Sequence, residues 1–87
     1  MYNYFMLIGR LEAINENSIV LNVAKPYKNA QGIFESETFE IQLDNTLMSI
    51  TTENFEIGDW FNVKGCIGKD KANNTILIGE RIIVERD

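Results

Sequence analysis

Alternation of apolar and polar residues is the dominant pattern along this chain, and it is clearest between residues 36 and 43. Two sets of side chains alternate there: Phe39, Ile41 and Leu43 in one set, and Thr38, Glu40 and Gln42 in the other. A period of two places the sets on opposite faces of a β-strand. We therefore predict that the apolar set enters a core and that the polar set faces solvent or a ligand.

The same alternation, interrupted by turn residues, predicts five strands and one short helix. The strands are expected at Asn3–Ile14, Ser18–Ala24, Ser36–Leu43, Trp60–Gly68 and Thr75–Glu85. The helix is expected within residues 44–54, where Asp44 or Asn45 can cap it and apolar residues recur at roughly helical spacing. The chain holds no repeat, linker or low-complexity segment, so residues 1–87 are interpreted as a single domain.

The first expected strand differs from the others because both of its faces are largely apolar. Phe5, Leu7 and Leu11 lie on one face, whereas Tyr4, Met6, Ile8 and Arg10 lie on the other. We expect this strand to be covered on two sides, with self-association covering the outer face. Gly9 interrupts the strand and predicts a bulge or a sharp bend.

The segment Lys25–Gly32 is the strongest candidate for a binding loop. It contains the only proline of the chain, Pro26, which cannot donate to a sheet ladder, and it ends in a glycine. Two lysines, Lys25 and Lys28, flank the exposed ring expected at Tyr27. We predict a loop that projects two ammonium groups and an aromatic side chain.

The order of strand, strand, strand, short helix, strand, strand, with a bent first strand, is typical of the OB-fold, a five-stranded Greek-key barrel. A six-stranded SH3-like barrel is the structural alternative, although it gives no reason for a helix at Asn45–Asn54. The predicted fold class is therefore all-β, with the helix between strands three and four.

Charge is distributed unevenly over an acidic chain of net charge −5. Residues 17–34 contain two lysines and no acid, residues 35–59 contain seven acids and no base, and residues 60–69 again contain two lysines and no acid. A basic groove on an acidic body is compatible with this pattern, since local potential rather than net charge attracts a polyanion.

The composition argues against catalysis. The chain has no histidine, and its one cysteine, Cys66, has no histidine or second cysteine to act with. We expect no catalytic residue, no metal site and no cofactor. The longest apolar run, Phe5–Ile8, is too short to span a membrane, the N-terminus lacks a leader pattern, and a single cysteine excludes an internal disulfide framework, so the expected location is the cytoplasm.

Several short sequence elements, in order, resemble the bacterial and phage single-stranded DNA-binding proteins of the SSB type. The matching elements are Asn3, Leu7–Leu11, Lys25–Asn29, Gly32, Phe39, Gly58, Phe61–Gly65, Glu80 and Ile82–Val84. The resemblance implies an OB-fold, single-stranded DNA as the partner, and a dimer or tetramer. The chain departs from the family in its short segment Lys69–Asn74 and in the acidic outer face of its third strand, so it resembles a short, divergent member. It ends at Asp87, so we do not expect recruitment of partners through an acidic tail.

Single-strand binding requires cations for phosphates and flat rings for bases. The candidate binding residues are Lys25, Tyr27, Lys28, Phe34, Trp60, Lys64, Lys69 and Lys71. Arg10 is a further candidate cation, and a contact at a subunit interface is equally expected for it. The predicted function is binding of single-stranded DNA without sequence specificity, in support of replication, repair or transfer. The alternative is an OB-fold module that binds a basic protein through its acidic face, with little or no nucleic-acid binding.

Overall fold

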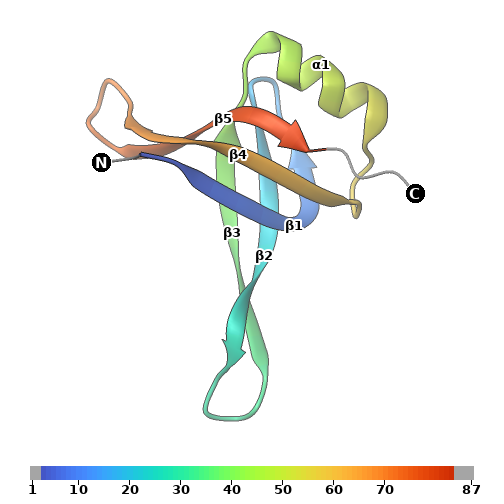
Figure 1. Ribbon diagram of the computed structural model, residues 1–87, viewed down its shortest axis with the longest axis vertical. Coiled ribbons are helices and arrows are strands. Elements are labelled where there is room, and N and C mark those ends of the chain that lie inside the picture. Colours follow the sequence, from blue (N-terminus) through green and yellow to red (C-terminus); the bar gives the residue numbers. More distant parts are fainter. Residues whose placement is uncertain (1–2, 84–87) are drawn as a thin grey trace.

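The strands close into a barrel in the order β1-β2-β3-β5-β4 in the computed structural model, which describes residues 3–83 (Figure 1). The elements are β1 at Phe5–Ile14, β2 at Ser18–Lys28, β3 at Phe34–Gln42, α1 at Asn45–Asn54, β4 at Trp60–Lys69 and β5 at Thr75–Ile83. Neighbouring strands are antiparallel except for β3 and β5, which close the barrel as a parallel pair. This topology, with its helix between β3 and β4, is an OB-fold. The SH3-like alternative is excluded.

Most of the alternating apolar residues fill the barrel as expected, whereas Phe39 is only partly buried and lies outside the core. The buried core consists of Leu11, Ile19, Leu21, Ile41, Leu43, Met48, Phe61 and Val63. Helix α1 contributes Met48 and the buried Thr51, and its N-terminus is capped by Asp44, whose side chain accepts a hydrogen bond from the Leu47 N–H at 2.8 Å. The predicted helix and its cap are therefore confirmed.

Strand β1 has two partners along its length. Its first half pairs with β4 and its second half with β2, and Arg10 is in register with both Trp60 and Asn22. A Cβ atom at Gly9 would lie 2.4 Å from the backbone oxygen of Asn22, so the two strands approach closely at this glycine. The irregularity in strand pairing lies between Leu11 and Ala13. Gly9 thus permits close packing, and the bulge is elsewhere.

The prediction of a loop at Lys25–Gly32 is wrong for its first four residues. Strand β2 continues through Lys28, and with β3 it forms a ribbon that projects from the barrel (Figure 1). The pairing register shifts between Ala24 and Lys28, which accommodates Pro26 without requiring its missing N–H. The turn is confined to residues 29–33. There Asn29 Oδ1 accepts hydrogen bonds from the N–H groups of Gln31 and Ile33 at 2.9 and 3.0 Å, and Gly32 has a φ of 76°.

Within one chain the outer face of β1 is exposed, with Tyr4, Met6 and Ile8 at 64, 54 and 52%, so its coverage by a second copy stays a prediction. Ile67 continues the alternation of the core residues Phe61 and Val63 on β4, but it is exposed. It lies near the end of β4, where the β4–β5 hairpin extends beyond the barrel, and its backbone is held by the side chain of Asn3 at 2.7 and 3.0 Å. Two expectations concern residues outside those described: that Tyr2 takes part in strand pairing between subunits, and that the last strand continues through residues 84–85.

Candidate nucleic-acid interface

The β2–β3 ribbon beyond the Ala24–Ser36 pair, residues 25–35, is here called the arm. It presents Tyr27, which is 68% exposed, and Phe34, which is also exposed. Lys28 is in register with Phe34, and its Nζ lies 5.6 Å from the centroid of that ring. The sequence-predicted residues Tyr27, Lys28 and Phe34 are therefore brought together on one short projecting ribbon.

Lys25 has a different environment from the one its sequence neighbours indicate. Strand pairing places its Nζ 3.2 Å from Glu35 Oε2 and 3.2 Å from Glu37 Oε1. Hydrogen bonds to Glu37 and then Glu35 raise the pKa of Lys25, whereas the Asn29 amide and then Lys25 lower the pKa of Glu35. No acid lies near Lys25 in sequence, but Glu35 and Glu37 are adjacent to it across the ribbon. Its charge is already compensated by two carboxylates.

Arg10 and Trp60 form a pair on the barrel wall. They are in register on β1 and β4, and the guanidinium carbon of Arg10 lies 4.1 Å from the centroid of the indole ring. Arg10 Nη1 also donates a hydrogen bond to the backbone oxygen of Gly58 at 2.9 Å. Trp60 remains 60% exposed, so much of the indole is accessible to a ligand. Sequence reasoning did not find this pair, although the antiparallel pairing of the first and fourth strands of an OB-fold was a signal that could have located it.

The Arg10–Trp60 pair belongs to a row of residues that crosses four strands. Arg10 is in register with Asn22 on β2, and Asn22 is in register with Thr38 on β3. Each of these lies next to an inward-facing residue of its strand, such as Leu11 or Leu21, so the row follows the outer surface. At about 4.8 Å between neighbouring strands, the row from Trp60 to Thr38 spans roughly 14 Å.

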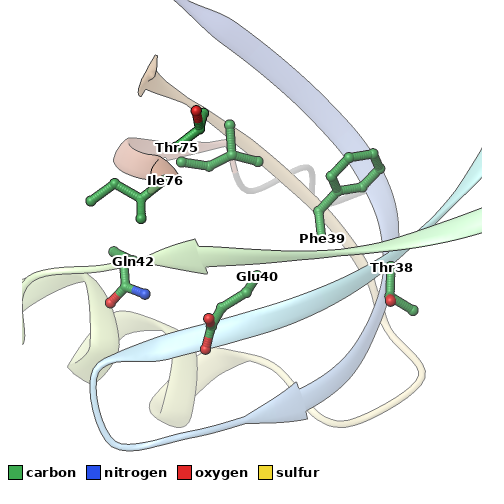
Figure 2. Close-up of a pocket in the computed structure, with 7 residues that line it drawn as sticks. Thr38, Phe39, Glu40, Gln42, Thr75 and Ile76 are labelled. Atoms are coloured by element: carbon green, nitrogen blue, oxygen red, sulfur yellow. The ribbon is translucent and has the colours of Figure 1, made fainter. Parts of the chain in front are cut away.

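A groove opens at the end of this row, where β3 and β5 diverge (Figure 2). Its lining residues are Thr38, Phe39, Glu40, Gln42, Thr75, Ile76 and Leu77. Glu40 is held by the buried hydroxyl of Ser18, which donates to Glu40 Oε2 at 2.9 Å. The groove therefore combines apolar side chains with an oriented carboxylate.

Lys64 lies on the outer side of β4, away from the arm. Its Nζ is 5.7 Å from the ring centroid of Tyr4, and Arg81 is in register with it on β5. Tyr4, Lys64 and Arg81 line a shallow depression together with Glu80. The structure thus adds Arg81, which sequence reasoning did not single out, to the cations of this surface.

Lys69 and Lys71 are exposed at the β4–β5 hairpin. Asp70, which separates them in sequence, accepts hydrogen bonds from the N–H groups of Asn74 and Ala72, each at 2.9 Å, and these bonds help lower the pKa of Asp70. The Asp70 carboxylate is therefore hydrogen-bonded to the backbone of the turn. Asn73, in this turn, adopts the left-handed backbone conformation, with a φ of 65°. Within residues 3–83, no carboxylate lies within salt-bridge distance of either lysine.

Among the described residues, no three His, Cys, Asp or Glu side chains are arranged to hold a metal ion. In the same part of the chain, no helix has the length and apolar character needed to cross a bilayer.

The fold of this chain is similar to that of several solved single-stranded DNA-binding proteins. The chain superposes with a TM-score of 0.69 on such a protein from Streptomyces coelicolor, at 12% identity over 98% of this chain and 96% of that one. A small single-stranded DNA-binding protein from Mycoplasma pneumoniae gives 0.69 at 12% identity over 100% and 98%. The mitochondrial protein Rim1 of S. cerevisiae gives 0.69 at 15% identity over 95% and 93%. No family sequence model and no curated protein sequence matches the chain. The resemblance drawn from short sequence elements is thus confirmed at the level of the fold.

Proposed function

We propose that this protein binds single-stranded DNA without sequence specificity. The observation that carries the proposal is that two exposed rings on the proposed path each have a cation beside them: Trp60 with Arg10, and Phe34 with Lys28. Stacking on such rings tolerates any base, and the neighbouring cations can neutralise phosphates. The structural neighbours, named as single-stranded DNA-binding proteins, support the same conclusion.

The proposed path of the strand uses two regions. On the arm, Tyr27 and Phe34 stack bases and Lys28 contacts a phosphate, whereas Lys25 is occupied by Glu35 and Glu37. On the barrel, Trp60 stacks a base and Arg10 contacts the adjacent phosphate. Lys64, Lys69 and Lys71 supply further phosphate contacts on the flanks. The net charge of −5 makes these local cations the source of the attraction.

We further propose that the protein self-associates through the outer face of β1. Tyr4, Met6 and Ile8 form an exposed apolar row there, which is the kind of surface a second copy covers. A homodimer or homotetramer in the cytoplasm, serving replication, repair or transfer of DNA, is the expected context. Sedimentation velocity of the wild-type protein tests this: a monomer at high micromolar concentration would contradict it.

The alternative function, binding of a basic protein by the acidic face, has less support. Two of the acids on β3 that motivated it, Glu35 and Glu37, are already paired with Lys25, and Glu40 accepts a hydrogen bond from Ser18. These carboxylates are partly used within the chain.

The direct test is fluorescence anisotropy of a labelled oligo-dT titrated with the protein, with a labelled duplex of equal length as the control. The proposal predicts saturable binding to oligo-dT that is at least tenfold tighter than binding to the duplex, as expected if stacking on unpaired bases contributes about 1–3 kcal/mol per base. Equal affinity for both would refute it.

A further inference from the structure

The groove between β3 and β5 differs in chemistry from the rest of the proposed interface. Glu40 carries the only charge among its seven lining residues, and that charge is negative. The Glu40 carboxylate would repel a phosphate placed in the groove, so the groove does not fit the backbone of a nucleic acid. Among the parts of a DNA strand, the group that fits is therefore a base, which is uncharged, carries hydrogen-bond donors and has a flat ring.

The groove exists because the parallel strand pair is short. Strands β3 and β5 are in register only at Ile41–Leu77 and Gln42–Ile78. Beyond these two pairs, residues 34–40 of β3 have only β2 as a partner strand within the described part of the chain. Figure 2 shows Thr75 and Ile76 across the opening from β3, with Phe39 emerging on the opposite side of the strand from Glu40 and Gln42. An open backbone edge, an aromatic ring and two polar side chains therefore meet at one place.

From these observations we infer that the groove is a nucleobase subsite that prefers cytosine to thymine. The inference rests on the proposed function and adds a base preference at this one subsite, whereas the stacking contacts elsewhere accept any base. Cytosine presents an amino group at N4, which is the donor that a glutamate carboxylate accepts, next to the acceptor N3, which the Gln42 amide can serve. Thymine has the same pyrimidine ring with a methyl group added at C5, but it presents a carbonyl oxygen, O4, where cytosine has its amino group, and this oxygen would face the carboxylate. Thr75 and the apolar side chains Phe39, Ile76 and Leu77 enclose the ring.

The orientation of Glu40 is fixed before any ligand arrives. The buried Ser18 hydroxyl donates a hydrogen bond to Oε2 of Glu40. The other carboxylate oxygen, Oε1, can accept a hydrogen bond from a base. A preoriented acceptor discriminates better than a mobile one because less side-chain freedom is lost on binding. Glu40 is therefore a specificity-determining residue of this subsite.

The groove lies where a DNA strand bound at Arg10 could reach it. Thr38, which lines the groove, is the last residue of the row Trp60, Arg10, Asn22 and Thr38. Two strand spacings, about 10 Å, separate Arg10 from Thr38. A DNA strand whose phosphate contacts Arg10 can thus place a nearby base in the groove.

The experiment compares the affinities of oligo-dC and oligo-dT of about 20 nucleotides at about pH 8, where cytosine is neutral, for the wild-type protein and for two variants. The wild type is expected to bind oligo-dC about tenfold more tightly than oligo-dT, the lower end of discrimination by a well-placed side chain. In Glu40→Gln this ratio should fall to near one, since the glutamine amide can donate to O4 of thymine and the Ser18 bond can be kept. Glu37→Gln removes the same charge from the same strand outside the groove, and it should keep the ratio.

The outcomes separate this inference from the proposed function. Equal binding of the two oligonucleotides by the wild type would overturn the subsite and leave single-strand binding intact. A cytosine preference that survives in Glu40→Gln would also overturn the subsite. Failure of the wild type to bind either oligonucleotide would overturn both proposals. The wild-type ratio decides the first point even if the Glu40 variant does not fold.

Discussion

Replacing Glu35 and Glu37 together by glutamine is expected to increase the affinity for single-stranded DNA by releasing Lys25. In the wild type, both carboxylates lie 3.2 Å from Lys25 Nζ, so a phosphate that binds this ammonium must displace them. The two ion pairs of Lys25 are partly solvent-exposed and contribute little to stability, so removing them should leave the fold unaffected. In the variant, Lys25 becomes a fourth exposed functional group on the arm beside Tyr27, Lys28 and Phe34.

The magnitude follows from counterion release. Each additional phosphate contact with a single strand steepens the dependence of log K on log salt by about 0.7. At about 0.1 M salt, ten raised to the power 0.7 corresponds to a gain of roughly fivefold in affinity. The measurement is a titration of labelled oligo-dT at four or so salt concentrations spanning about 50 to 200 mM, from which both the affinity and the slope are obtained.

The control separates release of Lys25 from the change in net charge. Glu53→Gln with Glu56→Gln makes the same change, from −5 to −3, at two exposed residues at and just after the end of α1. It should raise affinity less and leave the slope nearly unchanged. An equal slope in the two double variants would refute the reasoning that Lys25 is held by its carboxylates.

The remaining predictions concern the arm, the barrel and acid titration. Tyr27→Ala should cost about 1–3 kcal/mol of oligo-dT binding if the ring stacks a base, while Tyr27→Phe should bind nearly as the wild type; equal affinities for all three would move the site elsewhere. Gly9→Ala should lower the free energy of unfolding, measured by urea denaturation, by about 1–3 kcal/mol, because the added Cβ would press on the β2 backbone. In the control Gly68→Ala, the added Cβ meets only the flexible end of a side chain, so the loss of stability should be smaller. The reverse order of the two losses would contradict the packing described. The Glu35 carboxyl should titrate by NMR below the ordinary glutamate pKa of about 4.3 and shift upward in Asn29→Ala, since the Asn29 amide is the largest cause of the lowering; an unchanged midpoint would exclude that hydrogen bond. Because folding lowers this pKa, the interaction contributes to stability above the unfolded-state pKa and is lost as the pH falls through the folded-state value.

The elements of the fold could be predicted from the sequence because each is encoded locally. The alternation at residues 36–43 reports burial on one face directly, and Asp44 caps the helix that follows it. Pro26 was a misleading signal. A proline normally argues against a strand, but a register shift in β2 accommodates it, and such a shift depends on the partner strand.

The pairs that define the candidate site could not be predicted in the same way. Lys25 meets Glu35 and Glu37, and Arg10 meets Trp60, only because particular registers bring distant segments together. A shift of one residue in either pairing would turn these side chains to opposite faces. Residue types and their local neighbours predict which side chains can bind DNA, whereas register determines which of them remain available.

The central claim is tested most directly by titrating the intrinsic fluorescence of the protein with oligo-dT at two salt concentrations. The chain contains one tryptophan, so its emission under excitation selective for tryptophan over the three tyrosines reports on Trp60 alone. Five cations, Arg10, Lys28, Lys64, Lys69 and Lys71, each neutralising one phosphate give a slope of about 3.5, so raising salt from about 50 to 200 mM should weaken binding on the order of 100-fold. We predict saturable quenching with this steep salt dependence. An unchanged Trp60 signal, or an affinity that does not respond to salt, would contradict the account.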